Sequence, residues 1–270
     1  SSIPVVKELV PVAGDDRTTI QAAINEVAAL PVQTNGYRGT ILFRRGTYEI
    51  GSAITVTASG IVLRGEDTTT NLRATGTSQY DMILVGGSGG KSEASATLKP
   101  ITDAFVPIGA RSVTVASGHT FQVGDWVHVR REPHDAWIRL LGMDKINEID
   151  PSSSDWVAAD YKISYERKIT NVNGNVLTFD APMVDLIDTA YAKGYVVKFT
   201  SSRIKNIGIE NLKMTSTYSS TDLDAHGWKA IVFNKAEQCW VRSVTCYDFG
   251  YSCVYVSDDA AFITVENCSM

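Results

Sequence analysis

The sequence predicts an all-β protein: a right-handed parallel β-helix with an N-terminal capping helix and an inserted small β-barrel-like subdomain. Two observations indicate this fold, namely an eight-residue repeat near the C-terminus and an amphipathic segment near the N-terminus that is followed by short β-rich runs. The repeat occupies residues 207–214, 239–246 and 263–270. Repeats at such intervals are typical of solenoids, whose copies bury their apolar faces only by stacking on one another.

Each copy of the repeat reads as a strand, a one-residue bend and a second strand. Asn211, Ser243 or Asn267 stands at the bend, between two pairs of alternating apolar residues. Alternate side chains of a strand share a face, so we expect the apolar ones to stack inside successive coils and to be almost wholly buried. These inward residues are Ile207, Ile209, Leu212 and Met214; Cys239, Val241, Val244 and Cys246; and Ile263, Val265, Cys268 and Met270.

The N-terminal segment predicts a helix that covers the open end of the solenoid. The aspartate pair 15–16 can cap a helix that ends before Pro31 and whose apolar residues fall on one face. Strand-like runs separated by Gly, Ser and Thr then follow, as expected for the first coils. They lie at 40–43, 46–50, 54–56 and 61–65.

These N-terminal residues carry a resemblance to a known family. The run Asp15-Asp16-x-x-x-Ile20-Gln21-x-Ala23-Ile24, followed by Gly39-Thr-Ile-Leu-Phe43-x-x-Gly46-x-Tyr48 and Ile61-x-Leu63-x-Gly65, resembles the cap and first coils of the pectate-lyase-like superfamily. That superfamily includes polysaccharide lyases, glycoside hydrolases and phage tailspikes. The resemblance therefore implies the fold, but it does not choose a reaction, because the cap carries no catalytic residue.

A change in the spacing of the strand-like runs predicts the domain organisation. Residues 1–106 read as the cap and first coils, 107–183 as the inserted subdomain, and 184–270 as further coils without a C-terminal cap. Four strands are expected in the insertion, at 111–115, 121–129, 165–172 and 175–179. A long polar segment, 132–160, separates its halves, and loops of this length are usually functional or disordered.

Charge and composition exclude several classes of partner. The 270 residues carry a net charge of −5, and no run of Lys or Arg exceeds two residues, which disfavours nucleic acid and anionic membranes as partners. No apolar stretch is long enough to span a bilayer. Because the chain begins at Ser1 without a signal sequence, we expect a processed, secreted, extracellular protein. Because it stops at Met270 at the close of a coil, we expect a second polypeptide to continue or cap the β-helix.

The four cysteines, at 239, 246, 253 and 268, lack the spacing of a zinc site. Cys246 and Cys268 fall at inward positions, where reduced core cysteines are the favoured interpretation. A disulfide between neighbouring coils is the alternative.

One polar loop concentrates the residues that catalysis needs. Asp222, Asp224, His226 and Lys229 are the candidate catalytic residues, and Trp228 offers a surface for sugar stacking. β-Elimination of a uronate needs a base and neutralisation of the carboxylate, whereas hydrolysis needs two carboxyl groups. The loop could supply either chemistry. The alternative is that its polar residues only solvate a turn.

Further candidate substrate-binding residues lie elsewhere in the chain. Tyr251 is expected on a neighbouring coil, and Arg131, His134, Trp137 and Arg139 form a second cluster around the start of the long polar segment. Arginine suits carboxylate or sulfate recognition, although a surface strand edge with an aromatic side chain packed on the insertion is the favoured interpretation of this cluster. If the inserted subdomain lies over the coils, the two clusters could form the walls of one groove.

No metal ligand set is evident in the sequence. Ca²⁺ is possible at the adjacent pair Asp258 and Asp259, but calcium needs six to eight oxygen ligands.

The sequence thus favours a secreted carbohydrate-active enzyme that cleaves an acidic, uronate-containing polysaccharide, as a lyase or a hydrolase. The alternative function is a non-catalytic polysaccharide-binding or structural β-helix of the tailspike or adhesin type.

Overall fold

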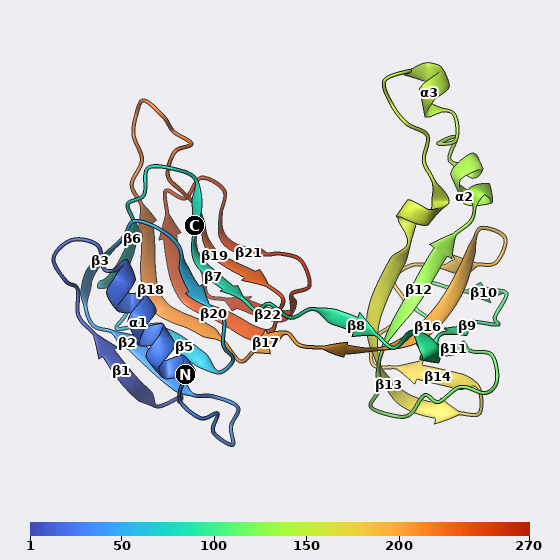
Figure 1. Cartoon of the computed structure of the whole chain (residues 1–270), viewed down its shortest axis with the longest axis horizontal. Coiled ribbons are helices and arrows are strands. Elements are labelled where there is room, and N and C mark those ends of the chain that lie inside the picture. The colour runs from blue at the N-terminus through green and yellow to red at the C-terminus, as the bar shows by residue number, and fades with distance from the viewer. The chain divides into compact units, whose positions relative to one another are not determined.

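The computed structural model describes residues 1–270 and divides into two compact units (Figure 1). Unit 1 comprises Ser1–Gly90 and Ser201–Met270, and unit 2 comprises Lys91–Thr200. Each unit has a hydrophobic core of its own. The predicted insertion, 107–183, lies inside unit 2, which extends further at both ends.

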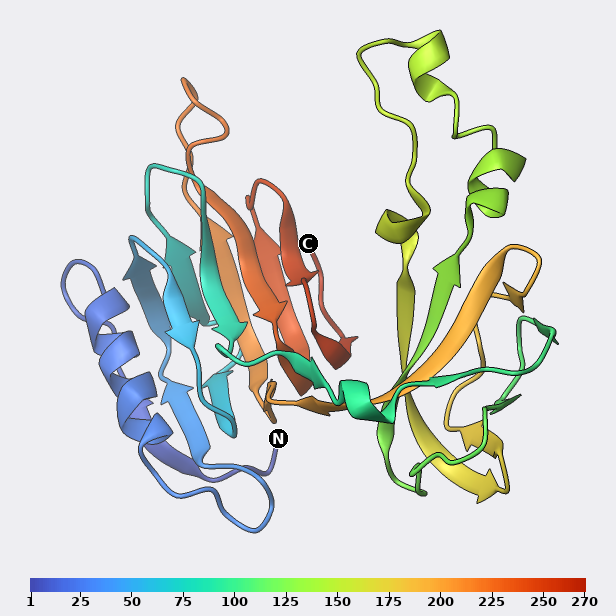
Figure 2. The same ribbon diagram turned by 45° about the vertical axis from the view of Figure 1, so that its right-hand side comes forward.

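Unit 1 is built from parallel strands wound into successive coils (Figure 2). A nine-stranded sheet and a four-stranded sheet, the latter in the order β4-β7-β19-β21, receive strands from each coil in turn. This is the arrangement expected of a parallel β-helix. The strands are β1 (Val5–Leu9), β2 (Gly39–Phe43), β3 (Gly46–Ile50), β4 (Ile54–Val56), β5 (Ile61–Gly65), β6 (Thr70–Ala74), β7 (Tyr80–Gly86), β17 (Ile204–Lys205), β18 (Gly208–Ser216), β19 (Gly227–Asn234), β20 (Ala236–Tyr247), β21 (Ser252–Val256) and β22 (Ala261–Glu266).

The stacking of the three repeats follows the predicted register. Ile209 of β18 pairs with Val241 of β20, which in turn pairs with Val265 of β22. The inward residues of the first two copies are at most 2% exposed. The expectation of near-complete burial is wrong for the third copy, where Val265 and Met270 are 47% and 65% exposed. Within residues 1–270 no coil packs on the far side of β22, so its side chains have neighbours on one side only.

The bends of the repeats are left-handed, as a one-residue turn requires. Asn211, Ser243 and Asn267 have φ angles of 56°, 52° and 54°. Asparagine tolerates this region better than most residues because its short amide can bond to nearby backbone. The bend therefore turns the strand direction without breaking the pairing on either side of it.

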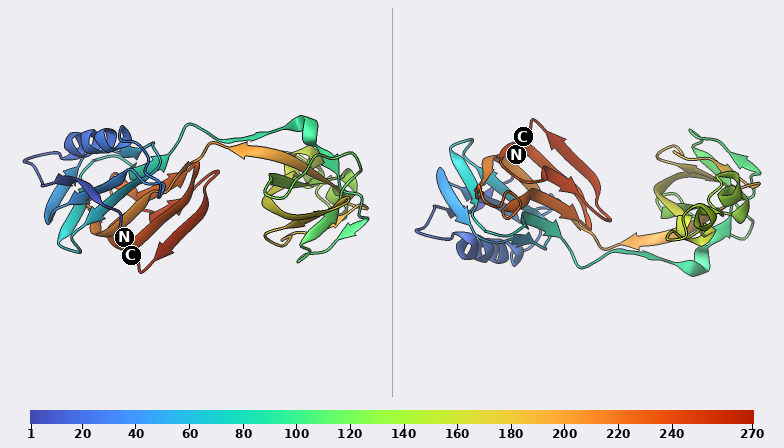
Figure 3. Two further views of the ribbon diagram at one scale, coloured as in Figure 1. Left: turned by 90° about the horizontal axis from the view of Figure 1, so that it is seen from below. Right: turned by 90° about the horizontal axis from the view of Figure 1, so that it is seen from above.

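Helix α1 (Arg17–Ala28) lies at one end of the strand stack, as predicted for a cap (Figure 3). Its buried residues, Ile20, Ala23, Ile24 and Val27, join the core of unit 1. The role expected for Asp16 is corrected: its carboxylate does not cap the helix but accepts hydrogen bonds from the backbone N–H groups of Val12, over 2.7 Å, and Glu49, over 2.9 Å. Asp16 thereby fastens the start of the helix to β3.

Unit 2 contains a seven-stranded antiparallel sheet in the order β11-β14-β13-β12-β16-β8, with β9 also on β16. The four predicted strands correspond to β11 to β14, although β12 begins only at Trp126. The elements are β8 (Lys91–Glu93), β9 (Lys99–Pro100), β10 (Phe105–Val106), β11 (Ser112–Thr114), β12 (Trp126–Pro133), α2 (Asp135–Leu140), α3 (Ile146–Ile149), β13 (Ile163–Asn173), β14 (Val176–Phe179), β15 (Ile187–Asp188) and β16 (Ala192–Ser201), with short 3₁₀ turns at Ser95–Thr97 and Ala158–Tyr161. No helix of the chain has both the length and the apolar character needed to span a bilayer.

The expectation of a reduced thiol is wrong for Cys246 and confirmed for Cys268. Cys246 at the end of β20 and Cys253 in β21 form a disulfide, with their Cα atoms 5.6 Å apart. Because β20 and β21 are consecutive strands joined by a short turn, the disulfide links two strands of one coil and not two neighbouring coils. Cys239 and Cys268 are free. Burial raises the pKa of the Cys239 thiol to about 11, so this cysteine behaves as a core residue.

Candidate functional site

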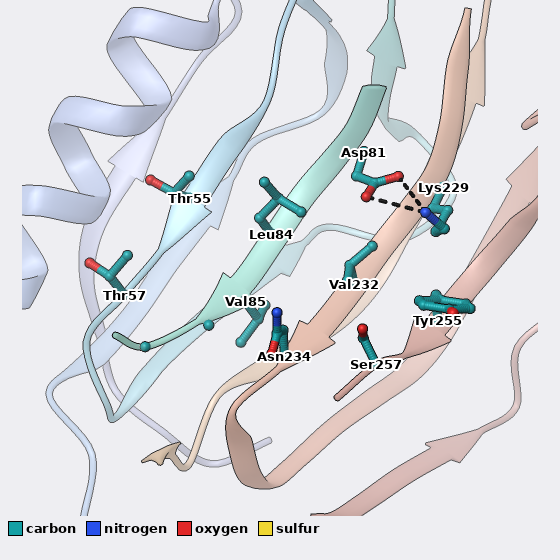
Figure 4. A pocket seen from close by; sticks show the side chains of 12 residues that line it. Thr55, Thr57, Asp81, Leu84, Val85, Lys229, Val232, Asn234, Tyr255 and Ser257 are labelled. Carbon is teal, nitrogen blue, oxygen red and sulfur yellow. Dashed lines mark hydrogen bonds and ion pairs between the residues drawn. The ribbon is translucent and has the colours of Figure 1, made fainter. Parts of the chain in front are cut away.

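The outer face of the four-stranded sheet of unit 1 carries an open groove of about 360 Å³ (Figure 4). All four strands contribute to it. Its lining residues are Thr55, Thr57, Asp81, Leu84, Val85, Gly86, Gly87, Lys229, Val232, Asn234, Tyr255 and Ser257.

The strand register explains why these residues meet. Thr55 pairs with Leu84, Leu84 with Val232, and Val232 with Tyr255, which makes one row across β4, β7, β19 and β21. Since every second residue of a strand faces the same side, the next outward residues form a further row. Asn234 stands in that second row, opposite Gly86 of β7. The groove is thus a direct product of parallel pairing.

One ion pair lies inside the groove (Figure 4). The Nζ atom of Lys229 is 3.2 Å and 3.4 Å from the two carboxylate oxygens of Asp81. The same amine lies 4.9 Å from the ring centre of Tyr255 and 5.7 Å from that of Tyr251, within the range of cation–π attraction. Lys229 is therefore held from two sides.

A cluster of three aromatic side chains lies beside this ion pair. The rings of Trp228 and Tyr251 are stacked with their centres 6.2 Å apart, and Tyr251 meets Tyr255 edge to face over 5.8 Å. Tyr251 is 58% exposed. An exposed ring with a polar tip offers a ligand an apolar face and a hydrogen-bonding hydroxyl at once.

The predicted catalytic residues do not share one location. Asp222 and Asp224 lie on an exposed loop, where Asp222 Oδ1 accepts the N–H groups of Asp224 and Ala225 and so shapes the turn. Asp222 also lines a second hollow, of about 400 Å³. The other residues of that hollow are Thr75, Gly76, Thr77, Thr217, Tyr218, Ser219, Thr221 and Ala225.

His226 is directed into unit 1. It is 5% exposed, and its Nδ1 lies 3.0 Å from Oγ of Ser216, which in turn accepts the N–H of Gly227 over 3.1 Å. The imidazole therefore joins β18 to the start of β19. Proximity in sequence placed His226 beside Lys229, but their side chains make different contacts.

The second predicted cluster lies in unit 2. Arg131 is 5% exposed, its Nε donates to the carbonyl of Leu186, and its guanidinium lies 5.1 Å from the ring centre of Trp137. His134 precedes α2, and Arg139 on that helix is exposed. A hollow of about 310 Å³ adjoins Arg131 and Trp137. Its other residues are Phe105, Leu140, Asp185, Leu186, Asp188 and Tyr191.

The candidate calcium ligands, Asp258 and Asp259, are not joined by further acidic residues. No three His, Cys, Asp or Glu side chains of the chain converge as a metal site would require. The backbone carbonyl of Asp258 accepts the N–H of Lys235 over 3.0 Å, which is a backbone contact between neighbouring coils.

No protein-family model matches the chain, and no curated protein matches its sequence. The solved structures that resemble it in fold include tailspike gp61 of Pseudomonas phage phi297 (15% identity, TM-score 0.47), tailspike gp49 from Pseudomonas phage LKA1 (16%, 0.45), and the gp54 tailspike of Acinetobacter baumannii bacteriophage AP22 in complex with A. baumannii capsular saccharide (14%, 0.41). Each match covers 86% of this chain but only 31%, 31% and 34% of the respective tailspikes. The chain spans about a third of the length of these proteins.

Sequence reasoning missed the groove residues Asp81, Asn234 and Tyr255. Asp81 and Lys229 are 148 residues apart in the chain, with unit 2 between them. No local pattern marks such a pair. The strand register of β7 and β19 was the signal that could have found it, and that register is visible only once the coils are aligned.

Proposed function

We propose that unit 1 is a right-handed parallel β-helix of the pectate-lyase-like kind and that it binds an extracellular polysaccharide along the outer face of the sheet β4-β7-β19-β21. The groove carries this proposal because it runs across all four strands, and an extended polymer needs an open surface that reaches over several strands. Asn234 and Ser257 offer hydrogen bonds to sugar hydroxyls, and Tyr255 offers a ring face.

Binding without cleavage is the function that the groove supports best. Hydrolysis of a glycoside calls for two carboxyl groups on either side of the scissile bond. Asp81 is the only carboxylate that lines the groove, and it is already paired with Lys229. Asp222 and Asp224 belong to the exposed loop.

Cleavage by a lyase or a hydrolase is the second candidate function. The hollow that Asp222 and Tyr218 line favours it, since this hollow could admit a sugar beside a carboxylate. The catalytic roles of Asp222, Asp224, His226 and Lys229 stay predictions.

A binding measurement with groove variants tests the first proposal. The purified chain is titrated with a panel of neutral and acidic polysaccharides by calorimetry, in parallel with Tyr255→Ala and Asn234→Ala. Tyr247→Ala is the matched control, because Tyr247 is 51% exposed at the end of β20 and lies outside the groove. We expect both groove variants to lose at least about tenfold in affinity, the cost of one good contact, and the control to bind as the parent does.

The same incubations separate the two candidate functions. New reducing ends accompanied by ultraviolet absorbance indicate β-elimination, and new reducing ends alone indicate hydrolysis. Binding with neither change supports the binding function. If no polysaccharide binds, or if the groove variants bind like the parent, the proposed site is wrong.

A further inference from the structure

The charge of the groove indicates which class of polysaccharide it accepts. Among its lining residues only Asp81 and Lys229 are charged, and they have opposite signs. Because they are paired with each other at 3.2 Å, the groove presents no net charge to a ligand. This differs from the acidic, uronate-containing substrate that the sequence suggests.

A uronate would have to compete with Asp81 for Lys229. If its carboxylate drew the amine away, the carboxylate of Asp81 would be left unpaired beside a second negative charge. Lys229 would also lose its position over Tyr255. A neutral sugar meets no such obstacle, because a hydroxyl can donate to Asp81 and accept from Lys229 while the ion pair stays intact.

The remaining polar lining is uncharged. Thr55, Thr57, Asn234 and Ser257 carry hydroxyl or amide groups that both donate and accept hydrogen bonds. These groups match the hydroxyls of a neutral sugar and give no preference to an anion. We propose that the groove selects neutral polysaccharides over their uronate counterparts, and that the Asp81–Lys229 pair enforces this selection.

This inference rests on the proposed function, and a set of matched ligands tests it separately. Glucan, mannan and galactan are each compared with the same polymer oxidised to the uronate at C6, at fixed low ionic strength. For the parent chain we expect the neutral polymer that binds to do so at least about tenfold more tightly than its oxidised form, since like-charge contacts of this kind oppose binding.

Removal of one charge should weaken or remove the preference for the neutral polymer. Asp81→Asn keeps the shape of the side chain but leaves Lys229 free, so the oxidised polymer should gain about tenfold in affinity, and added salt should abolish the gain. Asp248→Asn is the matched control, because Asp248 is exposed in a turn with a φ of 62°, which asparagine tolerates, and lies outside the groove. It should change neither affinity.

The outcomes separate the inference from the function on which it rests. Tighter binding of an oxidised polymer by the parent, or an Asp81→Asn variant that does not gain affinity for it, overturns the inference while polysaccharide binding stands. Absence of binding to every polymer overturns both.

Discussion

Arg64 of β5 donates from Nε to Oε1 of Glu210 of β18 over 2.7 Å, and the Glu210 side chain is fully buried. The two residues also pair in the strand register, so the contact joins the last coil before unit 2 to the first coil after it. Burial alone would raise the pKa of Glu210. Hydrogen bonds from the terminal amine of Ser1 and from Arg64 outweigh that effect and lower the pKa to about 2.

This pKa predicts a definite acid response. Because the folded pKa of Glu210 lies below the 4.5 of an unperturbed Glu, its contribution to stability is present above about pH 4.5 and is lost as the pH falls toward 2. The Glu210→Gln variant should therefore show a shallower loss of stability between pH 5 and 2, in urea unfolding followed by circular dichroism. At pH 7 it should be less stable by about 3–5 kcal/mol, since the guanidinium of Arg64 loses its buried counter-ion while keeping its bonds to Ser1 and Ile3. Equal pH slopes in variant and parent would contradict this prediction.

His226 is expected to matter for stability. Its imidazole is buried against Ser216, so His226→Ala removes one hydrogen-bond partner of a buried hydroxyl and should destabilise the fold by about 1–3 kcal/mol. Asp224→Ala on the exposed loop should change stability by less than about 0.5 kcal/mol. Thermal unfolding of both variants checks the difference, and equal melting temperatures would show that the buried contact contributes nothing.

Gly208 is expected to tolerate no side chain. A Cβ atom there would lie 2.2 Å from Cζ2 of Trp240, which pairs with Gly208 on the neighbouring strand. Gly208→Val should displace the indole, change its fluorescence and destabilise the protein by about 1–3 kcal/mol or more, the usual cost of overpacking. Gly90→Ala, with no atom nearer than 3.7 Å to the added carbon, is the control. Unchanged fluorescence in Gly208→Val would refute this close contact.

The thiols should differ in reactivity. With Cys246 and Cys253 joined and Cys239 buried, the native protein should show one readily modified thiol, that of Cys268. Unfolding without reductant should expose a second. Thiol titration with intact-mass analysis measures both numbers. The double variant Cys246→Ser, Cys253→Ser should lose about 2 kcal/mol of stability, as expected for a short closed loop; four reactive thiols in the unfolded parent would show that no disulfide forms.

The sequence was informative where the fold repeats. The alternation in 207–214 and 239–246 predicted the inward residues and the register, because period-two patterning and stacking are both local consequences of the strand. The bends at Asn211 and Ser243 were predicted for the same reason. The near-complete burial expected of 263–270 was wrong, since burial depends on what packs against a coil and not on its own pattern.

The candidate site was harder to predict because it depends on distant strands. The run from Asp222 to Lys229 looked like one constellation, yet its members separate: His226 packs inward, and Lys229 pairs with Asp81. Alternate residues of an extended chain face opposite ways, so a dense polar run in sequence rarely converges on one point. Only the alignment of β7 with β19 brings the groove residues together.

The insertion of unit 2 also bears on how the chain folds. Arg64 and Glu210, whose contact joins two neighbouring coils, are 146 residues apart in sequence. An unfolded chain would therefore have to close a long loop to bring these coils together. The part of this loop that is not already closed is shorter, because the N–H of Ser202 donates to the carbonyl of Gly90 over 3.1 Å, and these two residues flank unit 2. If unit 2 folds first around its own core, it brings the ends of the two segments of unit 1, Ser1–Gly90 and Ser201–Met270, close together. Unit 2 would then fold before unit 1. The strands of unit 1 on either side of the insertion would find their register with less loss of chain entropy.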